Sequence, residues 1–225
     1  MKKIVSLMLV AVMMVMTLTS CDLVDKLFGN DTETRYTITE EEWNTIMAMK
    51  NYTVNTTGKT VTTGTMNGET QTSEENSTVN AKFTEDSQHH KSEGTRYGGE
   101  TFVNEYYYAT KDGVKYRLNA DGSNAYEYEW ESETFYDFCF GDSEVAFEDL
   151  TYDEAEKAYK VDVENGETTI KMTIYFENGM VVKAIGEMNV EQSAEGYSIV
   201  MSAVATMTVS ETGTTVVEVP EFTVE

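Results

Sequence analysis

The chain has 225 residues, with 16 lysines and arginines against 40 aspartates and glutamates, and a formal net charge of −24. A surface with this charge repels nucleic acid and anionic lipid head groups, so the composition argues against binding to either. The length is sufficient for one domain with a substantial core, and no internal repeat indicates a second domain.

The first twenty residues have three parts. Lys2 and Lys3 form a short basic region, and an apolar run from Ile4 to Met16 follows it. The run is too short to span a bilayer comfortably, which is typical of a signal sequence. Leu18-Thr19-Ser20-Cys21 fits the lipobox, so we expect cleavage before Cys21 and lipidation of its thiol. An ordinary signal peptide with a chance cysteine is the alternative.

This interpretation predicts a signal peptide at residues 1–20, a lipidated tether at 21–35 and a single antiparallel β domain at 36–225. Two or more acyl chains, palmitate among them, would keep the protein on a membrane, because one chain alone binds only marginally. We therefore expect an extracytoplasmic protein that is lipid-anchored to a bacterial membrane. The cell membrane and the outer membrane both fit.

A short amphipathic helix is expected at about residues 40–50. Thr39 is a good N-cap, and Glu42 stands where a capping box requires an acid. Trp43, Ile46 and Met47 follow a spacing of 3.6 residues per turn and form an apolar stripe. We expect this stripe to pack on a sheet.

After Asn51 the sequence is β in character, and five turns share one chemistry. They are Met66-Asn67-Gly68, Lys111-Asp112-Gly113, Ala120-Asp121-Gly122, Glu164-Asn165-Gly166 and Glu177-Asn178-Gly179. Asn-Gly and Asp-Gly between alternating segments favour β-hairpins, because these residues tolerate positive φ. The sequence therefore predicts a mostly β fold in which consecutive strands pair antiparallel as a single meander.

Matching apolar faces across the last two turns predicts their registers. A three-residue loop at 177–179 would place Phe176 opposite Met180 and Ile174 opposite Val182. A two-residue turn at Asn165-Gly166 would place Val161 opposite Ile170.

An aromatic wall is expected between Thr101 and Glu131. Three strands there carry Phe102, Tyr106 and Tyr108; Val114, Tyr116 and Leu118; and Tyr126, Tyr128 and Trp130. Opposing these faces requires three-residue loops at 111–113 and 120–122, with Gly122 left-handed. The resulting pairs are Tyr108 with Tyr116, Tyr116 with Tyr126, Val114 with Tyr128, Lys115 with Glu127, and Asn119 with Ser123. The opposite face would then carry charges, among them Lys115 and Arg117.

Such a wall is unlike an ordinary core, where leucine, isoleucine and valine dominate. Tyrosine has an apolar body and a polar tip, which suits a partly wet cavity or a binding face. The candidate wall of a ligand cavity consists of Tyr106, Tyr108, Tyr116, Tyr126, Tyr128, Trp130, Ile174 and Phe176. The alternative is a core covered by the Trp43 helix, with tyrosine hydroxyls at its rim.

Two segments remain open. The threonine-rich stretch from Thr53 to Asn80 fits either a pair of exposed strands or a poorly packed flap. Glu133 to Glu156 interrupts the meander and is interpreted as a connection with one helical turn. Within it, Cys139 lies among aromatic residues, so we expect a buried, inert thiol.

No pattern indicates catalysis, a metal or a cofactor. His89 and His90 are the two histidines, and on a strand they would point to opposite faces, so they cannot chelate one metal together. No zinc-like spacing, calcium loop or phosphate-binding glycine motif occurs. We therefore expect no catalytic residue, no metal site and no cofactor, and a protein that is not an enzyme.

The plan resembles the LolA-like superfamily of lipoprotein carriers and lipid-binding lipoproteins. An amphipathic helix (Trp43 to Lys50) precedes a first strand, Asn51-Tyr52-Thr53-Val54, and a long meander follows. Thr173 to Lys183 looks like a late strand–turn–strand, and the chain ends with a strand running into Val219-Pro220. The resemblance implies a curved, half-barrel-like sheet around a cavity for acyl chains, with the N-terminal helix packed on it.

No functional residue of the carriers maps onto this chain, so the resemblance implies binding of a lipid or other hydrophobic ligand rather than lipoprotein transfer. The expected function is that of a membrane-anchored lipoprotein with a hydrophobic ligand in the cavity of a curved sheet. The alternative is a surface interaction or structural lipoprotein with a closed core. A protein partner is not indicated by the sequence.

Overall fold

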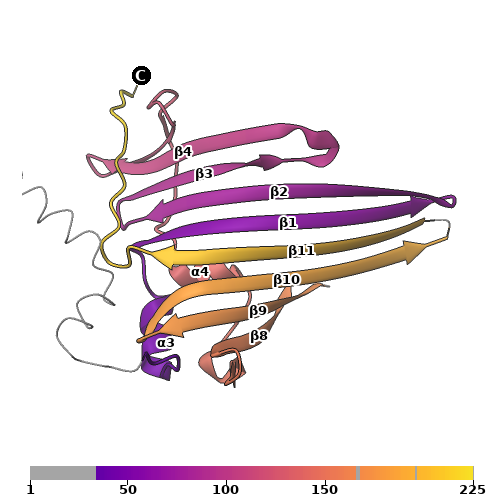
Figure 1. Cartoon of the computed structure of the whole chain (residues 1–225). Helices are drawn as coiled ribbons and strands as arrows, with labels where there is room; N and C mark the ends of the chain where they lie inside the picture. The colour runs from indigo at the N-terminus through magenta and orange to yellow at the C-terminus, as the bar shows by residue number, and fades with distance from the viewer. Residues whose placement is uncertain (1–33, 166–167, 196, 225) are drawn as a thin grey trace, which may run out of the picture. The chain divides into compact units, whose positions relative to one another are not determined.

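A computed structural model describes residues 34–165, 168–195 and 197–224. The expected signal peptide, Cys21 and almost all of the expected tether lie outside these residues. The described residues form an eleven-stranded antiparallel sheet (Figure 1). Its strands are β1 (Tyr52–Met66), β2 (Glu69–Phe83), β3 (Ser87–Thr95), β4 (Thr101–Lys111), β5 (Val114–Asn119), β6 (Tyr126–Glu127), β7 (Thr151–Asp153), β8 (Ala158–Asn165), β9 (Thr168–Glu177), β10 (Met180–Ala194) and β11 (Tyr197–Ser210).

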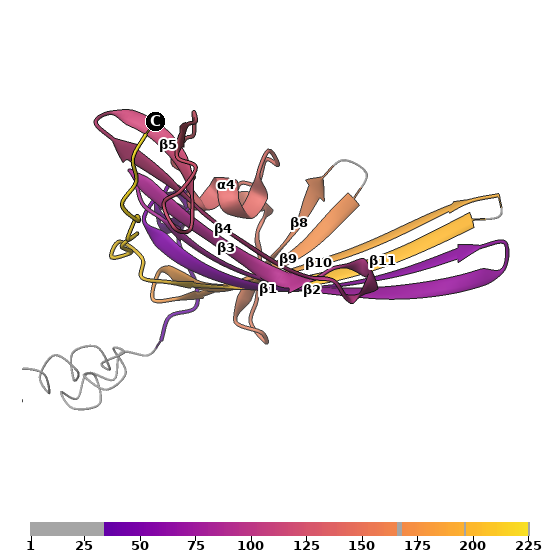
Figure 2. The ribbon, with the colours of Figure 1, turned by 90° about the horizontal axis from the view of Figure 1, so that it is seen from above.

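The strand order is β6-β5-β4-β3-β2-β1-β11-β10-β9-β8-β7. Two meanders therefore grow outward from a central seam, where the first strand pairs with the last. Along this seam Thr53 lies opposite Ser210 and Met66 lies opposite Tyr197. The sheet is open and curved (Figure 2). The expected fold class, a mostly β antiparallel sheet that curves like a half-barrel, is confirmed.

Two helices, α3 (Glu40–Met47) and α4 (Phe135–Phe140), occur in the described chain. They pack on one side of the sheet, which we call the inner face (Figure 2). The expected capping box of α3 is present: the backbone N–H of Glu42 donates to Thr39 Oγ1 at 3.2 Å, and the Thr39 N–H donates to a Glu42 carboxylate oxygen at 2.9 Å. This confirms the predicted helix, three residues shorter than expected.

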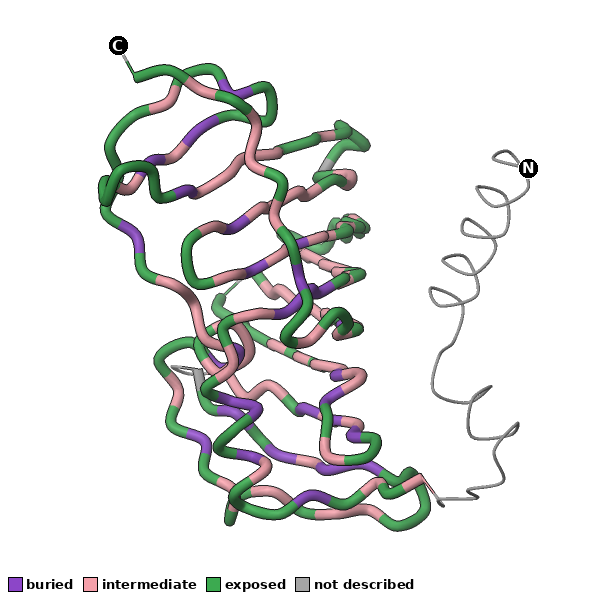
Figure 3. The backbone as a smooth tube through the Cα atoms, turned by 90° about the vertical axis from the view of Figure 1, so that its left-hand side faces the viewer, coloured by how far each residue is buried: buried purple, intermediate pink, exposed green. Residues whose placement is uncertain are grey.

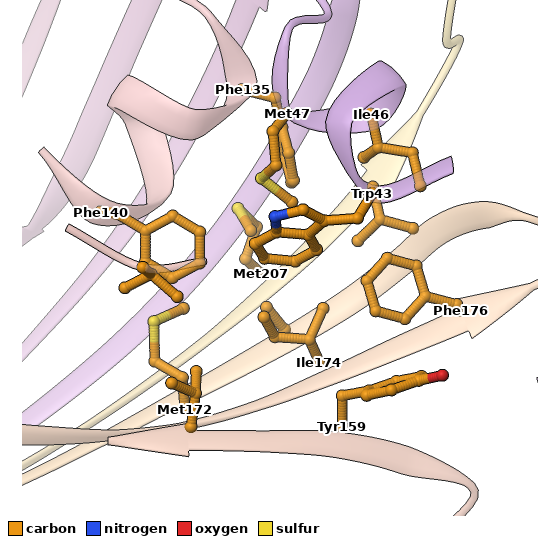
Figure 4. Packing of buried hydrophobic residues seen from close by; sticks show 14 of the residues in the cluster. Trp43, Ile46, Met47, Phe135, Phe140, Tyr159, Met172, Ile174, Phe176 and Met207 are labelled. Atoms are coloured by element: carbon orange, nitrogen blue, oxygen red, sulfur yellow. The ribbon is translucent and has the colours of Figure 1, made fainter. Parts of the chain in front are cut away.

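The main core lies between α3, α4 and the inner face (Figure 4). The ring of Trp43 lies 6.5 Å from that of Phe176 and 6.0 Å from that of Phe140, so it joins the sheet to both helices. Ile46 and Met47 are buried beside it, as their spacing predicted. Along the strands, buried positions alternate with more exposed ones (Figure 3).

The segment 133–156 provides α4, a 3-10 turn at Phe147–Asp149 and the edge strand β7. The expected helical turn is therefore confirmed, and it is extended by elements that the sequence did not indicate. Cys139 lies on α4, and burial, with Glu133 nearby, raises the pKa of its thiol. An uncharged thiol is a poor nucleophile, in keeping with the inert role expected for it.

The β9–β10 turn is shorter than predicted. Glu177 pairs with Met180, so Asn178 and Gly179, at φ 50° and 80°, form a two-residue turn. A β-bulge at Val182 then restores the phase, and Val181 instead of Val182 lies opposite Phe176. The predicted pairs of Phe176 with Met180 and Ile174 with Val182 are wrong, because Asn-Gly fits the tighter turn and the bulge absorbs one residue.

The β8–β9 hairpin keeps its predicted faces with a shifted register. Val161 pairs with Met172 and Val163 with Ile170, so the predicted pair of Val161 with Ile170 is wrong. The register differs from the prediction by one residue on each strand, which is two residues in all. Because side chains alternate with a period of two, the same residues still face the core. The turn residues 166–167 lie outside the described chain.

The open alternatives for 53–80 are decided in favour of paired strands. β1 and β2 form one long hairpin with a two-residue turn at Asn67-Gly68. Its outer half joins that of β10 and β11 to form a four-strand extension, residues 58–66, 69–77, 186–194 and 197–205 (Figure 1). Neither α3 nor α4 reaches this part of the sheet in the views shown.

The last described residues cross the outer face instead of continuing the sheet. β11 ends at Ser210, so the expected strand running into Val219-Pro220 is wrong. Thr53 Oγ1 lies 3.0 Å from Thr215 Oγ1, and the Phe222 ring lies 5.4 Å from that of Tyr116. Val219 and Phe222 thereby cover a second, small core of Ala109, Tyr116 and Leu118 on β4 and β5.

We expect Trp43→Ala to lower the free energy of unfolding by about 3–5 kcal/mol, because the change empties the site that joins both helices to the sheet. Urea denaturation followed by circular dichroism measures this loss. Thr45→Ala, on the exposed side of the same helix, is the matched control and should change stability by no more than about 0.5 kcal/mol. Equal losses in the two variants would contradict the assigned core.

Candidate functional site

The inner face has three regions. α3 and α4 cover its middle. To one side, β3 to β6 carry a group of rings that we call the aromatic belt: His90, Tyr106, Tyr108, Tyr126, Tyr128 and Trp130. In the four-strand extension, β10 and β11 carry a stripe that we call the apolar floor: Met188, Val190, Tyr197, Ile199, Met201, Ala203 and Ala205.

The eight residues predicted to line a cavity divide among different surroundings. Ile174 and Phe176 lie in the main core, with 2% and 0% of their surface exposed. Five others, Tyr106, Tyr108, Tyr126, Tyr128 and Trp130, share the inner face in the aromatic belt. The eighth, Tyr116, lies on the outer face beneath Phe222. The belt and the core residues therefore cannot act as one continuous wall with Tyr116.

Tyr116 is displaced by the length of the β4–β5 turn. Lys111 pairs with Val114, so Asp112 and Gly113, at φ 54° and 80°, make a two-residue turn instead of a three-residue loop. Tyr108 consequently pairs with Arg117, and the predicted pair of Tyr108 with Tyr116 is wrong. Because side chains alternate with a period of two, this one-residue change turns all of β5 over.

The following turn reverses the change. Gly122 is left-handed at φ 80°, and the Asn119 N–H donates to the Ser123 carbonyl at 3.0 Å, as predicted. Asn124 then adopts a positive φ of 51° and adds one residue before the ladder resumes. As a result β6 faces inward again. The pairs formed are Tyr116 with Glu127 and Arg117 with Tyr126, so the predicted pairs Tyr116–Tyr126, Val114–Tyr128 and Lys115–Glu127 are wrong.

The rings of the belt contact one another across three strands. His90 stacks on Tyr106 with ring centroids 5.0 Å apart and planes 9° apart. Tyr108 stacks on Tyr128 at 5.6 Å and lies 5.8 Å from Trp130. Tyr126 and Tyr128 remain 45% and 44% exposed. The belt is thus a ring-lined surface whose β6 end is open to solvent.

The inversion of β5 also brings two cations among these rings. The sequence placed Lys115 and Arg117 on the opposite face from the tyrosines, and this is wrong. The Arg117 guanidinium lies 4.6 Å from the centre of the Tyr106 ring and donates to the Tyr126 hydroxyl at 3.0 Å. Lys115 Nζ donates to the Trp130 carbonyl at 2.5 Å.

Sequence reasoning missed the apolar floor. Every inward residue of β11 from Tyr197 to Val209 is apolar, while its outward residues are serine, threonine and valine. Met188 of β10 lies opposite Ala203 of β11, and Val190 of β10 lies opposite Met201 of β11. The signal was visible as apolar residues at each second position, but only the pairing of β11 with β1 and β10 shows how wide the stripe is.

A hollow of about 400 Å³ lies at the outer end of the floor. It is lined by Thr62, Gly64, Thr65, Met66, Glu69, Gln71, Ser73, Glu75, Tyr197 and Ile199. The hollow exists because the β1 residues there are small threonines and a glycine, and polar residues of β2 line one side of it. The floor is therefore an apolar stripe with a polar margin.

His89 and His90 point to opposite faces, as alternation predicted. His89 Nε2 lies 3.0 Å from a carboxylate oxygen of Glu105 on the outer face. On the inner face His90 Nε2 lies 3.2 Å from the Gln88 side-chain oxygen, against the ring of Phe83. Among residues 34–165, 168–195 and 197–224, no three histidine, cysteine or acidic side chains gather as a metal site.

In the described part of the chain, no helix is long and apolar enough to cross a membrane.

One further ionisable group borders the belt. Burial, with Asp137 nearby, raises the pKa of Glu133, and Glu133 in turn contributes to the raised pKa of Tyr106. This acid therefore stands near the end of the belt that faces α4.

No protein-family model matches the sequence, and comparison with curated proteins finds no relative. Among solved structures, an S-type phycobiliprotein lyase from Guillardia theta is similar at 9% identity and a TM-score of 0.27, over 68% of this chain and 85% of the lyase. A DUF1329 family protein from Desulfovibrio piger ATCC 29098 has 6% identity and a TM-score of 0.21, over 76% of this chain and 88% of the other.

A domain described as belonging to an outer membrane lipoprotein-sorting protein, from Vibrio parahaemolyticus, has 9% identity and a TM-score of 0.22, over 76% of this chain and 89% of that one. Likenesses at these TM-scores carry no argument about function.

We expect stability to depend on the protonation of His90. Burial, with a smaller effect from His89, lowers the pKa of His90 from 6.5 to about 4. Between pH 6.5 and 4 the unfolded chain therefore binds a proton that the folded chain does not, and folding loses about 3 kcal/mol as the pH falls. Urea denaturation of wild type and His90→Gln at intervals across this range isolates the effect from the carboxylates.

The difference in stability between wild type and His90→Gln should change across this window and be constant below it. His89→Gln is the control, since His89 lies on the outer face and burial is the larger cause of the lowered pKa of His90, so this variant should keep most of the pH dependence. A difference that does not vary with pH would contradict the burial of a neutral His90.

Proposed function

We propose that this chain is a membrane-anchored, extracytoplasmic lipoprotein without catalytic activity that binds an apolar ligand, a lipid acyl chain, along the apolar floor of the inner face. Lipidation of Cys21 would hold it at a membrane where such ligands are present. The assignment moves the expected ligand site from the aromatic wall to the extension of β10 and β11.

One observation supports this proposal above the others. The inward face of β11 remains apolar through Ile199, Met201 and Ala203, beyond Met207, the last of its residues that is buried in the main core. A strand face that served only solubility would carry polar residues there, as the outer half of β2 does with Glu69, Gln71 and Ser73. The apolar face of β11 therefore fits an apolar ligand that the chain itself does not supply.

The dimensions and composition of the floor suit an acyl chain. From Ile199 to Met207 the strand rises about 26 Å at about 3.3 Å per residue, and one leaflet of a bilayer is about 15 Å deep. Ala203 and Ala205 leave room for a chain to lie close to the backbone, and methionines adapt to ligands of varied shape. Burial would contribute about 25 cal/mol per Å² of apolar surface removed from water.

The alternative is an interaction module whose floor is covered by another protein and takes up no ligand. Complete burial of Ile174 and Phe176 beneath α3 favours this alternative, because that part of the inner face is closed. Uptake of a small apolar probe distinguishes the two functions, since a flat protein-binding surface has little affinity for a single acyl chain.

We expect Met201→Glu to weaken uptake of a fluorescent fatty acid by about tenfold or more, because it places a charge where the apolar chain would lie. Val200→Glu is the matched control: it is the preceding residue of the same strand, points to the outer face and is 46% exposed. Its affinity should stay within about twofold of wild type. Fluorescence titration measures both, with a thermal melt to verify folding.

Absence of uptake by the wild-type chain at any accessible concentration would overturn the acyl-chain proposal and favour the interaction module. Equal losses in Met201→Glu and Val200→Glu would place the ligand elsewhere.

Lipid attachment is tested separately. Cys21→Ser should abolish incorporation of radiolabelled palmitate and release the protein from membranes, because the thiol that accepts the first lipid is removed. Cys139→Ser serves as the control, since this thiol is packed within α4, and it should leave labelling unchanged. Undiminished labelling of the Cys21→Ser protein would exclude the lipobox assignment.

A further inference from the structure

The aromatic belt has features that an apolar ligand does not require. We propose that it is a second binding site, for a ligand that has a ring with an apolar face and carries a carboxylate, with Arg117 as the carboxylate-binding residue. The site is separate from the apolar floor and does not depend on the proposed acyl-chain binding.

The unpaired cations are the first observation. Among the described residues, ion pairs form at Lys59, at His89 and at Lys160, but neither Lys115 nor Arg117 has an acidic partner. Cations without an ion pair are common among the described residues, but these two lie among the rings of the belt. The polar partners of Arg117 are the hydroxyls of Tyr126 and Tyr108, neutral groups that a carboxylate can replace or join.

The geometry of Arg117 favours a planar anion. Its guanidinium lies over the Tyr106 ring at 4.6 Å, which restricts the plane of the group, and its N–H groups bind neutral tyrosine hydroxyls instead of an acid. A guanidinium held in this way can donate two parallel hydrogen bonds to a carboxylate.

The exposed rings are the second observation. Tyr126 and Tyr128 are about half exposed, with centroids 6.1 Å apart and planes at 87°. Stacking of Tyr128 on Tyr108 and the hydrogen bond from Arg117 to Tyr126 hold both rings in place. Rings fixed at a surface present apolar faces on which the C–H side of a sugar or a second aromatic ring can stack.

The third observation is an unsatisfied donor within the belt. Trp130 is only 7% exposed, and its indole N–H has no hydrogen-bond partner. A buried donor without an acceptor is unfavourable, and native structures usually provide a partner. A ligand oxygen that reached this N–H by displacing a neighbouring ring would satisfy it. The three observations together describe ring stacking, a carboxylate partner and an acceptor position.

The indole N–H of Trp130 provides the test. The chain has two tryptophans, so a ¹H–¹⁵N spectrum of the full-length protein in detergent contains two indole signals, and Trp130→Phe identifies one of them. We would titrate a galacturonic acid oligosaccharide, neutral maltoheptaose and benzoate. The expected result is a saturable shift of the Trp130 signal with one of the two carboxylates, while the core Trp43 signal and the maltoheptaose titration show no change.

Arg117→Met should then weaken the binding of that carboxylate by about tenfold, whereas Lys91→Met, which removes a cation from the outer face of β3, should leave it unchanged. A shift with the oligosaccharide identifies an acidic sugar, and a shift with benzoate alone identifies an aromatic acid. The proposal is overturned if neither carboxylate shifts the signal, if maltoheptaose binds equally well, or if Lys91→Met has the effect of Arg117→Met.

Discussion

The pairing of β1 with β11 holds the two meanders of the sheet together. It joins Thr53 to Ser210 and Met66 to Tyr197, residues far apart in the sequence, whereas the other strand pairs are formed by consecutive strands. The chain must close this long loop before the two meanders can share one sheet, and closing it costs conformational entropy. Asn51 and Thr53 also bind Thr215, which holds the start of the C-terminal segment at the same seam.

Turn chemistry made the hairpins predictable, and turn length limited what could be predicted about the site. The helix at 40–47, its capping box and the inward faces of β8 and β9 followed from local patterns. Asp-Gly, however, fits both a two-residue turn and a three-residue loop, and the two differ by one residue of register. For β5 that one residue decides whether Tyr116 or Arg117 accompanies Tyr108.

The choice at β5 depends on an element that local sequence cannot reveal. The predicted pairing of the aromatic faces of β4, β5 and β6 assumed that only one face of the sheet is covered. The C-terminal segment covers the other side as well, and Val219 and Phe222 give Tyr116 and Leu118 a place to pack. Both faces of β5 make contacts within the protein, so alternation of side chains no longer distinguishes a buried face from a solvent-exposed face. The sequence pattern therefore cannot decide which residues of β5 face inward.

The lengths of the elements explain why the inner face has uncovered regions at all. β1, β2 and β10 have 15 residues each, and α3 has 8. At about 3.3 Å per residue the strands reach about 50 Å, while the helix at about 1.5 Å per residue covers about 12 Å. Two short helices can therefore bury only the middle of the sheet. The apolar floor and the aromatic belt lie beyond that middle, so neither helix covers the inward side chains of these two regions.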